Sequence, residues 1–377
     1  MITVLKNANV YIDGKFQLKD IAINEKIQKI GVSLSGETEI DLSGKYITPG
    51  FIDIHIHGRG GVEATSDCAA LSKILAKLGV TSFLPTTLTL SEEETLKALS
   101  KLADYIENQD NKGAEAIGIY SEGIFFSKEK CGAQNPDYIK ETIDFKLVES
   151  MVEAARGHLK VMAFAPENKG SAQLCAYLKE KGIRASMGHS NATEEEITPC
   201  LESGLTGVTH IYNGMRWMNH LELGTGGVGT FDDRLYAELI TDGYHVNKEF
   251  VNILFKFKPI DKILFISDNV HLSGLPEGKG SMGGVPVIIE KDKLIVDQSS
   301  VYSLAGSCLK LTDSIKNVMK MTGISIEELL KCVTKNPAEY VGVNDRKGSI
   351  EVGFDADINI FDKEFNLLKT YIKGEEV

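Results

Sequence analysis

The feature that most constrains the fold of this 377-residue chain is the regular alternation of short apolar runs with amphipathic segments from Ile47 to about Val343. Apolar runs of strand length include TSFLPTTL, KVMAFAPE and KILFISDN, and segments such as SAQLCAYLKEKG have the apolar spacing of helices. Strands that alternate with helices predict parallel βα units, and about eight such units predict a closed barrel. We therefore expect an α/β fold built around a (β/α)8 TIM barrel over residues 49–345.

Both ends of the chain have the period-two alternation that is typical of β-strands. The first 48 residues include NVYIDGKF with a turn signal at Asp13 and Gly14, and residues 346–377 include DINIFD and LLKTYIKG. Two sets of short strands at opposite ends of a chain can pair with each other. We expect residues 1–48 and 346–377 to form one small sheet domain beside the barrel.

Composition limits the class of partner. The chain has 53 acidic and 41 basic side chains, a formal net charge of -12, which argues against nucleic acid or an anionic membrane as the main partner. No apolar stretch is long enough to span a bilayer. The six cysteines form no C-x-x-C pair and are expected to be reduced thiols. These features predict a cytoplasmic protein that acts on a small molecule, and an anionic substrate would need local positive groups or backbone N–H donors.

Two histidines interrupt an isoleucine-rich run in the segment PGFIDIHIHG. On a regular strand His55 and His57 point to one side, together with Asp53 and opposite to the isoleucines at 52, 54 and 56. Neutral imidazole is the commonest side-chain metal ligand, and Gly58 lets the chain turn immediately afterwards. Two packing histidines are the alternative, but a pair at strand spacing favours a metal site.

Four more acids and imidazoles stand at the ends of apolar runs: Glu122 in YSEG, His189 in MGHS, His210 in THIYN and Asp268 in FISDN. The C-terminal ends of barrel strands converge on one mouth, where active sites lie. Each residue alone could be a surface acid, a helix cap or a packing residue. Because burying acids and imidazoles without partners is costly, their joint placement favours a shared divalent metal.

The motifs together resemble the amidohydrolase superfamily, and within it the N-acetylglucosamine-6-phosphate deacetylase family. The resemblance extends from the first strand to the last and is carried by TPGFIDIHIHGRGG, GIYSEGIFFSKEKCGAQNPDYI, MGHSNAT, THIYNGM, AELITDGYHV, FISDN, LAGS and NPAEYVGVNDRKGSIEVGFDADINIFD. The His-x-His element indicates only the superfamily. Its combination with the Glu122 segment, THIYNGM and DGYHV is specific to the deacetylase branch.

The resemblance implies hydrolysis of the N-acetyl amide of an amino-sugar 6-phosphate by a (β/α)8 barrel that carries a small β-sandwich domain built from both termini. It implies one or two divalent metal ions, zinc or iron, in each subunit of a homodimer. Asp268 would be the general acid/base, Glu122, His189 and His210 would hold one metal, and His55 and His57 would permit a second. The residues implied in substrate binding are Ala133, Gln134, Asn213, Gly214 and His245.

The chain departs from the family pattern at three positions that bear on the substrate. Ile124 replaces a proline, Gln134 replaces a histidine that would lie against the substrate, and Leu221 replaces an arginine that would serve the phosphate. A glutamine amide can donate a hydrogen bond but carries no charge, and leucine cannot bind an anion. We consider Arg216 the candidate to compensate at the phosphate, with Arg59 and His220 as alternatives.

These departures keep other activities open. The substrate could be N-acetylgalactosamine 6-phosphate or an N-acetyl sugar without phosphate. A catalytically silent barrel is the remaining alternative, and the retention of all five metal-ligand candidates and of Asp268 argues against it.

Overall fold

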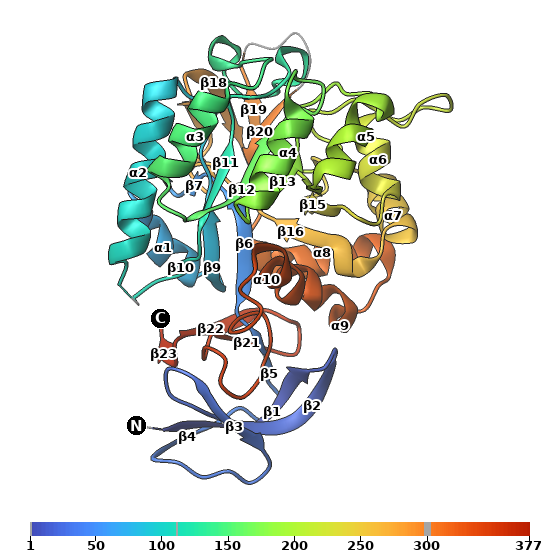
Figure 1. The fold of residues 1–377 in the computed structure, drawn as a ribbon. Helices are drawn as coiled ribbons and strands as arrows, with labels where there is room; N and C mark the ends of the chain where they lie inside the picture. The colour runs from blue at the N-terminus through green and yellow to red at the C-terminus, as the bar shows by residue number, and fades with distance from the viewer. Residues whose placement is uncertain (1, 111, 298–302) are drawn as a thin grey trace.

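The structure is a computed structural model that describes residues 2–110, 112–297 and 303–377. Its centre consists of two parallel sheets (Figure 1). The smaller sheet has the order β10-β9-β6 and comprises β6 (Phe51–Ile56), β9 (Val80–Pro85) and β10 (Glu115–Ala116). The larger sheet runs in chain order through β11 (Ile119–Glu122), β12 (Leu159–Phe164), β13 (Arg184–Met187), β14 (Leu205–Val208), β15 (Tyr236–Ile240) and β16 (Ile263–Ile266).

Backbone hydrogen bonds join the two parallel sheets at two places. Beyond β9, the N–H of Thr87 donates to the carbonyl of Tyr120 in β11 at 3.1 Å. Beyond β16, the N–H of Asp268 donates to the carbonyl of His55 in β6 at 2.9 Å. The ends of β6, β9, β11 and β16 are therefore joined by backbone hydrogen bonds, and the α/β class predicted from the sequence is confirmed.

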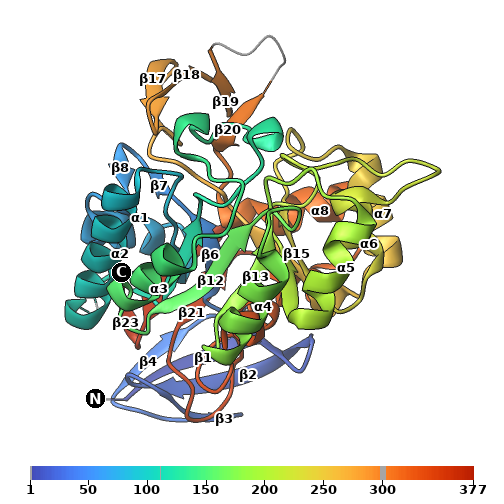
Figure 2. The same cartoon turned by 45° about the horizontal axis from the view of Figure 1, so that its top comes forward.

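Helices lie around the outside of the central strands (Figures 1 and 2). Local signals fix several of their starts: the Thr193 hydroxyl accepts from the N–H of Glu196 and the Glu196 side chain accepts from the N–H of Thr193, a capping box. The helices are α1 (Cys68–Ala76), α2 (Glu92–Asn108), α3 (Phe145–Ala154), α4 (Ser171–Glu180), α5 (Glu194–Ser203), α6 (Gly224–Phe231), α7 (Lys248–Phe257), α8 (Ser314–Thr322), α9 (Ile326–Leu329) and α10 (Lys335–Val341). Short 3-10 turns are η1 (Lys128–Lys130), η2 (Pro136–Tyr138), η3 (Ile260–Lys262), η4 (Leu311–Asp313) and η5 (Leu330–Val333).

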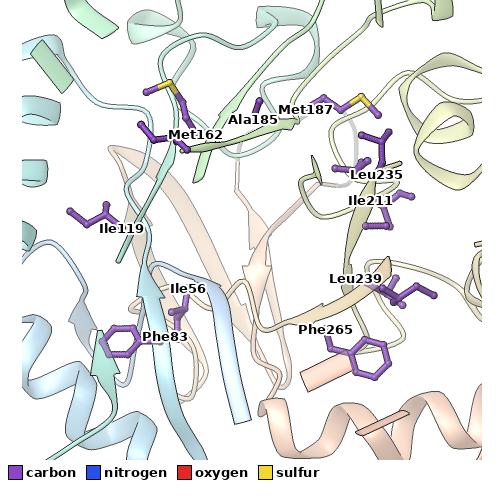
Figure 3. Close-up of a cluster of buried hydrophobic side chains, with 14 of the residues drawn as sticks. Ile56, Phe83, Ile119, Met162, Ala185, Met187, Ile211, Leu235, Leu239 and Phe265 are labelled. Carbon is purple, nitrogen blue, oxygen red and sulfur yellow. The ribbon is translucent and has the colours of Figure 1, made fainter. Parts of the chain in front are cut away.

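Alternate residues of the central strands belong to two hydrophobic clusters. In β12, Met162 and Phe164 belong to the larger cluster, which includes buried residues of the surrounding helices, whereas Val161 and Ala163 belong to a smaller one. Figure 3 shows part of the larger cluster, with side chains labelled from β6, β9, β11, β12, β13, β15 and β16. Each strand therefore has two buried faces, as expected for parallel strands covered by helices.

The alternation predicted for β6 is wrong in one respect. Ile52 and Ile54 pack in the smaller cluster, but Ile56 packs in the larger one, so the three isoleucines do not share one face. The pairing of β6 with β9 shifts register between Asp53 and Ile56, and this irregularity turns the end of the strand.

The two ends of the chain pair in one eight-stranded sheet. The link is antiparallel pairing of β5 with β21, in which Ile47 lies opposite Ile360. In Figure 1 this sheet lies below the parallel strands. Its strands are β1 (Thr3–Ile12), β2 (Lys15–Ile23), β3 (Ile27–Gly31), β4 (Thr38–Asp41), β5 (Tyr46–Pro49), β21 (Ile358–Phe361), β22 (Leu367–Ile372) and β23 (Glu375–Glu376).

A four-stranded antiparallel sheet interrupts the alternation of strands and helices after β16, and the sequence reasoning did not anticipate it. It comprises β17 (Gly278–Met282), β18 (Val285–Glu290), β19 (Lys293–Val296) and β20 (Leu304–Ser307) and has its own hydrophobic cluster. It lies above the parallel strands, at the end opposite to the terminal sheet (Figure 2). A short hairpin of β7 (Gly58–Arg59) and β8 (Val62–Glu63) follows β6. Among the described residues, no helix is long and apolar enough to cross a membrane.

A buried ion network ties the terminal sheet to β10. Lys347 Nζ lies 2.5 Å from Asp357, 2.9 Å from Glu115 and 3.1 Å from Asp355, and the Lys347 side chain is 2% exposed. Arg346 contacts Glu115 and Asp355, each at 2.7 Å. Burial alone would raise the pKa of Glu115, but Arg346 and Lys347 outweigh it and lower that pKa to about 2. The network therefore consists of ionised groups at neutral pH.

We expect Lys347→Ala to lower the free energy of unfolding by about 3–5 kcal/mol, because it leaves three carboxylates close together without their shared cation. Urea unfolding at pH 7 measures the change. Lys363→Ala is the control, since that side chain is 80% exposed and its ion pair within the described part of the chain is with Glu364. Equal midpoints for the two variants would show that the network does not stabilise the fold.

Candidate metal and catalytic site

The acids and imidazoles singled out in the sequence come together at one end of the parallel strands. His55 lies in β6 and His57 directly after it, while Glu122 is the last residue of β11. His189, His210 and Asp268 each follow the end of a strand by two residues, after β13, β14 and β16. All six side chains are buried, although they are polar or charged. Side chains far apart in sequence meet here because parallel strands end at the same face.

Unusual backbone conformations direct three of these side chains. His189, His210 and Asp268 have φ angles of 45°, 30° and 48°, in the left-handed region that non-glycine residues seldom adopt. Such conformations cost free energy and persist where the surroundings impose them, which is common at functional sites. The strained residues coincide with the ends of β13, β14 and β16.

Glu122 lies at the centre of the group. Its Oε1 is 2.9 Å from His210 Nε2, 3.3 Å from His189 Nε2 and 3.6 Å from His55 Nε2. Its Oε2 is 3.2 Å from His57 Nε2. Two sets of potential metal ligands result, and they share this carboxylate: Glu122 with His189 and His210, and Glu122 with His55 and His57.

The donor set fits a divalent metal ion. Metal-binding histidines usually donate the N–H of the second ring nitrogen to a carboxylate or a carbonyl, which fixes the ring. His55 Nδ1 lies 2.8 Å from Glu238 Oε2, and His189 Nδ1 lies 2.9 Å from the carbonyl of Lys130. These contacts fit a proton on Nδ1 of both rings, and a bound metal ion would then be held by Nε2, the ring atom nearer to Glu122.

Glu238 is a site residue that the sequence reasoning missed. It lies within β15, is 1% exposed, and its Oε2 also accepts from the backbone N–H of His210 at 3.2 Å. The available signal was an acid inside the apolar run AELI, where an unpaired carboxylate is costly. Asp53 is similar: it is buried in β6, and its Oδ1 accepts from the N–H of Ser267 at 3.2 Å.

The acids and histidines in the site shift one another's pKa values toward the charged forms. Burial disfavours the imidazolium of His55, but the charges of Glu122 and Glu238 outweigh it and raise the pKa of His55 well above its usual range. Burial likewise disfavours the Glu122 carboxylate, yet the neighbouring histidines hold its pKa well below the usual range. The pKa of Asp268 is also lowered, because the hydrogen bond to His57 and the nearby histidine charges exceed the cost of burial. Both carboxylates are therefore ionised, the form that ligates metals.

A cavity of about 300 Å³ opens onto this group. Glu122, His57, His189, His210 and Asp268 line it, and so do five of the six predicted substrate residues: Ala133, Gln134, Asn213, Gly214 and His245. Gly214 has a φ of 58°, and a Cβ there would lie 2.9 Å from His189 Nδ1. Only glycine therefore fits at position 214 without displacing the histidine.

The predicted cationic groups lie elsewhere. Arg216 does not line the cavity, and its guanidinium pairs with Glu222 at 2.8 Å. Arg59 is buried and donates to Asn269 and to the carbonyl of Leu309. Leu221 is 84% exposed. Among the described residues that line the cavity there is no lysine or arginine.

Comparison with known proteins identifies the class. Residues 46–377 match the sequence model of the amidohydrolase family, and the chain belongs to that family.

Its similarity to particular members extends over most of the chain. N-acetylglucosamine-6-phosphate deacetylase of Bacillus subtilis (strain 168) is 32% identical over 334 residues, 87% of this chain and 83% of the relative. N-acetylgalactosamine-6-phosphate deacetylase of Escherichia coli O157:H7 is 30% identical, and the match covers 93% of this chain and 91% of the relative. The crystal structure of N-acetylglucosamine-6-phosphate deacetylase from Pasteurella multocida matches with a TM-score of 0.92, 29% identity and full coverage of both chains. The resemblance read from the sequence is confirmed.

We expect Glu122→Ala to weaken metal binding by more than the roughly 10- to 100-fold typical of losing an outer partner of a ligand, because both ligand sets lose their shared member. Metal content after gel filtration, measured by mass spectrometry, gives the readout. Glu129→Ala is the matched control, since its side chain is 66% exposed. Equal metal content in the two variants would contradict the assignment of Glu122 as a ligand.

Proposed function

We propose that the protein hydrolyses the N-acetyl amide of N-acetylglucosamine 6-phosphate to glucosamine 6-phosphate and acetate. The observation that carries the proposal is the convergence of Glu122, four histidines and Asp268, all of which except His55 line one cavity, in a chain similar to named deacetylases of this specificity. A metal-dependent hydrolase in amino-sugar catabolism is the class that this combination supports.

The architecture in this proposal is a closed (β/α)8 barrel over residues 49–345 and a small β-sandwich domain from residues 1–48 and 346–377. The backbone hydrogen bonds between the ends of β9 and β11 and of β16 and β6 support closure. The shared terminal sheet supports the domain limits. The proposed assembly is a homodimer.

Glu122, His189 and His210 would hold one divalent ion, and His55 and His57 would hold a second with the same carboxylate. Zinc and iron are the proposed metals, because imidazole and carboxylate ligands suit both. When bound, such an ion lowers the pKa of water and polarises an amide carbonyl. The remaining roles fall to side chains that line the cavity.

Asp268 is proposed as the general acid/base. Its Oδ1 lies 3.4 Å from His57 Nε2 and 3.6 Å from His55 Nε2, and the side chain lines the cavity. Because its pKa is lowered, it is a carboxylate at neutral pH and can accept the proton that the attacking water loses. The same group can then deliver that proton to the departing amine.

The sugar would lie against Ala133, Gln134, Asn213, Gly214 and His245. His245 Nδ1 contacts Asp242 Oδ2 at 2.7 Å, which orients the ring and leaves Nε2 available to the substrate. Asn213 and Gly214 follow His210 by three and four residues, so the same turn would position both a metal ligand and a substrate contact.

The absence of lysine and arginine from the described lining residues favours a second candidate, an N-acetyl sugar without phosphate. The chain is also similar to an N-acetylgalactosamine-6-phosphate deacetylase, so N-acetylgalactosamine 6-phosphate is a third candidate substrate. Acetate release from N-acetylglucosamine, its 6-phosphate and N-acetylgalactosamine 6-phosphate separates the three. The main proposal requires the highest kcat/KM for N-acetylglucosamine 6-phosphate.

We expect Asp268→Asn to lower kcat by roughly 10²- to 10⁴-fold, the usual contribution of a general acid/base, while bound metal stays at the wild-type level. An enzymatic acetate assay and metal analysis of the same sample measure the two quantities. Asp345→Asn, a substitution at an exposed position, is the control. Wild-type turnover in Asp268→Asn would rule out the assigned role.

A further inference from the structure

Gln134 is a buried amide that is hydrogen-bonded at both ends. Its Nε2 donates to Glu122 Oε2 at 2.7 Å, and its Oε1 accepts from the N–H of Thr89 at 2.8 Å. The side chain is 6% exposed. Because exchanging the amide oxygen and nitrogen would break both bonds, Gln134 is held in one orientation.

The bond from Gln134 selects one of the two oxygens of Glu122. Oε2, which Gln134 contacts, is the oxygen that lies 3.2 Å from His57 Nε2. Oε1 is the oxygen that lies 2.9 Å from His210 Nε2 and 3.3 Å from His189 Nε2. The terminal torsion of a glutamate is broad, so a carboxylate without such a bond can rotate between orientations.

We propose that Gln134 is a positioning residue that fixes Glu122 as a ligand shared by two metal ions and sets the affinity of the ion on the His55 and His57 side. This inference rests on the proposed function through its metal ions. An amide does not ionise, so it can donate to Glu122 regardless of pH. The ion on the His189 and His210 side would be held by Oε1, which Gln134 does not contact.

Loss of the Gln134 hydrogen bond should lower the affinity for one of the two metal ions. Removing the partner of a metal-ligating group typically weakens metal binding by roughly 10- to 100-fold. Gln134→Met keeps the length of the side chain and removes both hydrogen bonds. We expect it to lower the affinity for the ion on the His55 and His57 side by that factor. The other ion should bind with wild-type affinity.

The experiment is a titration of metal-free protein with Zn²⁺ in competition with a chromogenic chelator, followed by metal analysis after dialysis. Wild-type protein should hold two ions per chain and Gln134→Met should hold one under the same chelator. Two further variants assign the weakened ion: His57→Ala should reproduce the loss, and combining it with Gln134→Met should add little. An additional loss in the double variant would overturn the proposal.

Gln109→Met is the matched control. Gln109 also holds the backbone through both ends of its amide, with bonds of 2.8 and 3.0 Å to the N–H and carbonyl of Ala116 in β10. Its substitution should change thermal stability without changing the metal ratio. A fall in metal content for Gln109→Met equal to that for Gln134→Met would overturn the proposal, because the effect would then be a general loss of stability.

Three further results would overturn the proposal. Gln134→Met could bind both ions with wild-type affinity, it could bind both with equally reduced affinity, or the wild-type protein could hold a single ion. Metal binding is measured without substrate, so the result is independent of the reaction. Wild-type protein that binds two ions in the predicted pattern but releases no acetate would overturn the proposed function alone.

Discussion

The site depends on one buried negative charge, the carboxylate of Glu122. An ionised carboxylate that is 1% exposed is stable only when hydrogen-bond donors or cations surround it. Its neighbours come from β6 and from the turns after β13 and β14, together with the amide of Gln134. No single segment of chain can supply such a shell. Parallel strands that end at one face can, and this requirement links the order of the strands to the chemistry at their ends.

The surroundings of the ligands hold them in strained positions. Each of the three left-handed residues is hydrogen-bonded to its surroundings: the His189 ring to the carbonyl of Lys130, the His210 N–H to Glu238, and the Asp268 N–H to the carbonyl of His55. Strain at the strand ends is tolerated because the strands below are packed on both faces by the two hydrophobic clusters. The tightly packed strands thus lie beneath the site, and the cavity lies above it.

The sequence predicted that these side chains would lie together, because that required only two physical facts. Acids and imidazoles are costly to bury alone, and parallel strands end together, so residues such as Glu122 and His210 had to meet. Glu238 was missed because its partner, His55, lies on a strand that is distant in sequence, and an acid within a strand gives no indication of its neighbour. Arg216 was expected near the substrate, but a nearby glutamate, Glu222, pairs with it. The sheet β17–β20 was missed because a short antiparallel insertion has the same alternation as any strand.

Crystals soaked in Zn²⁺ and measured at the zinc absorption edge test the central claim most directly. The account predicts an anomalous peak about 2.0–2.2 Å from Nε2 of His189, from Nε2 of His210 and from an oxygen of Glu122, the distances of zinc to nitrogen and oxygen ligands. A fully loaded crystal in which the ion lies outside the cavity, or in which Glu122 does not touch it, would contradict the account.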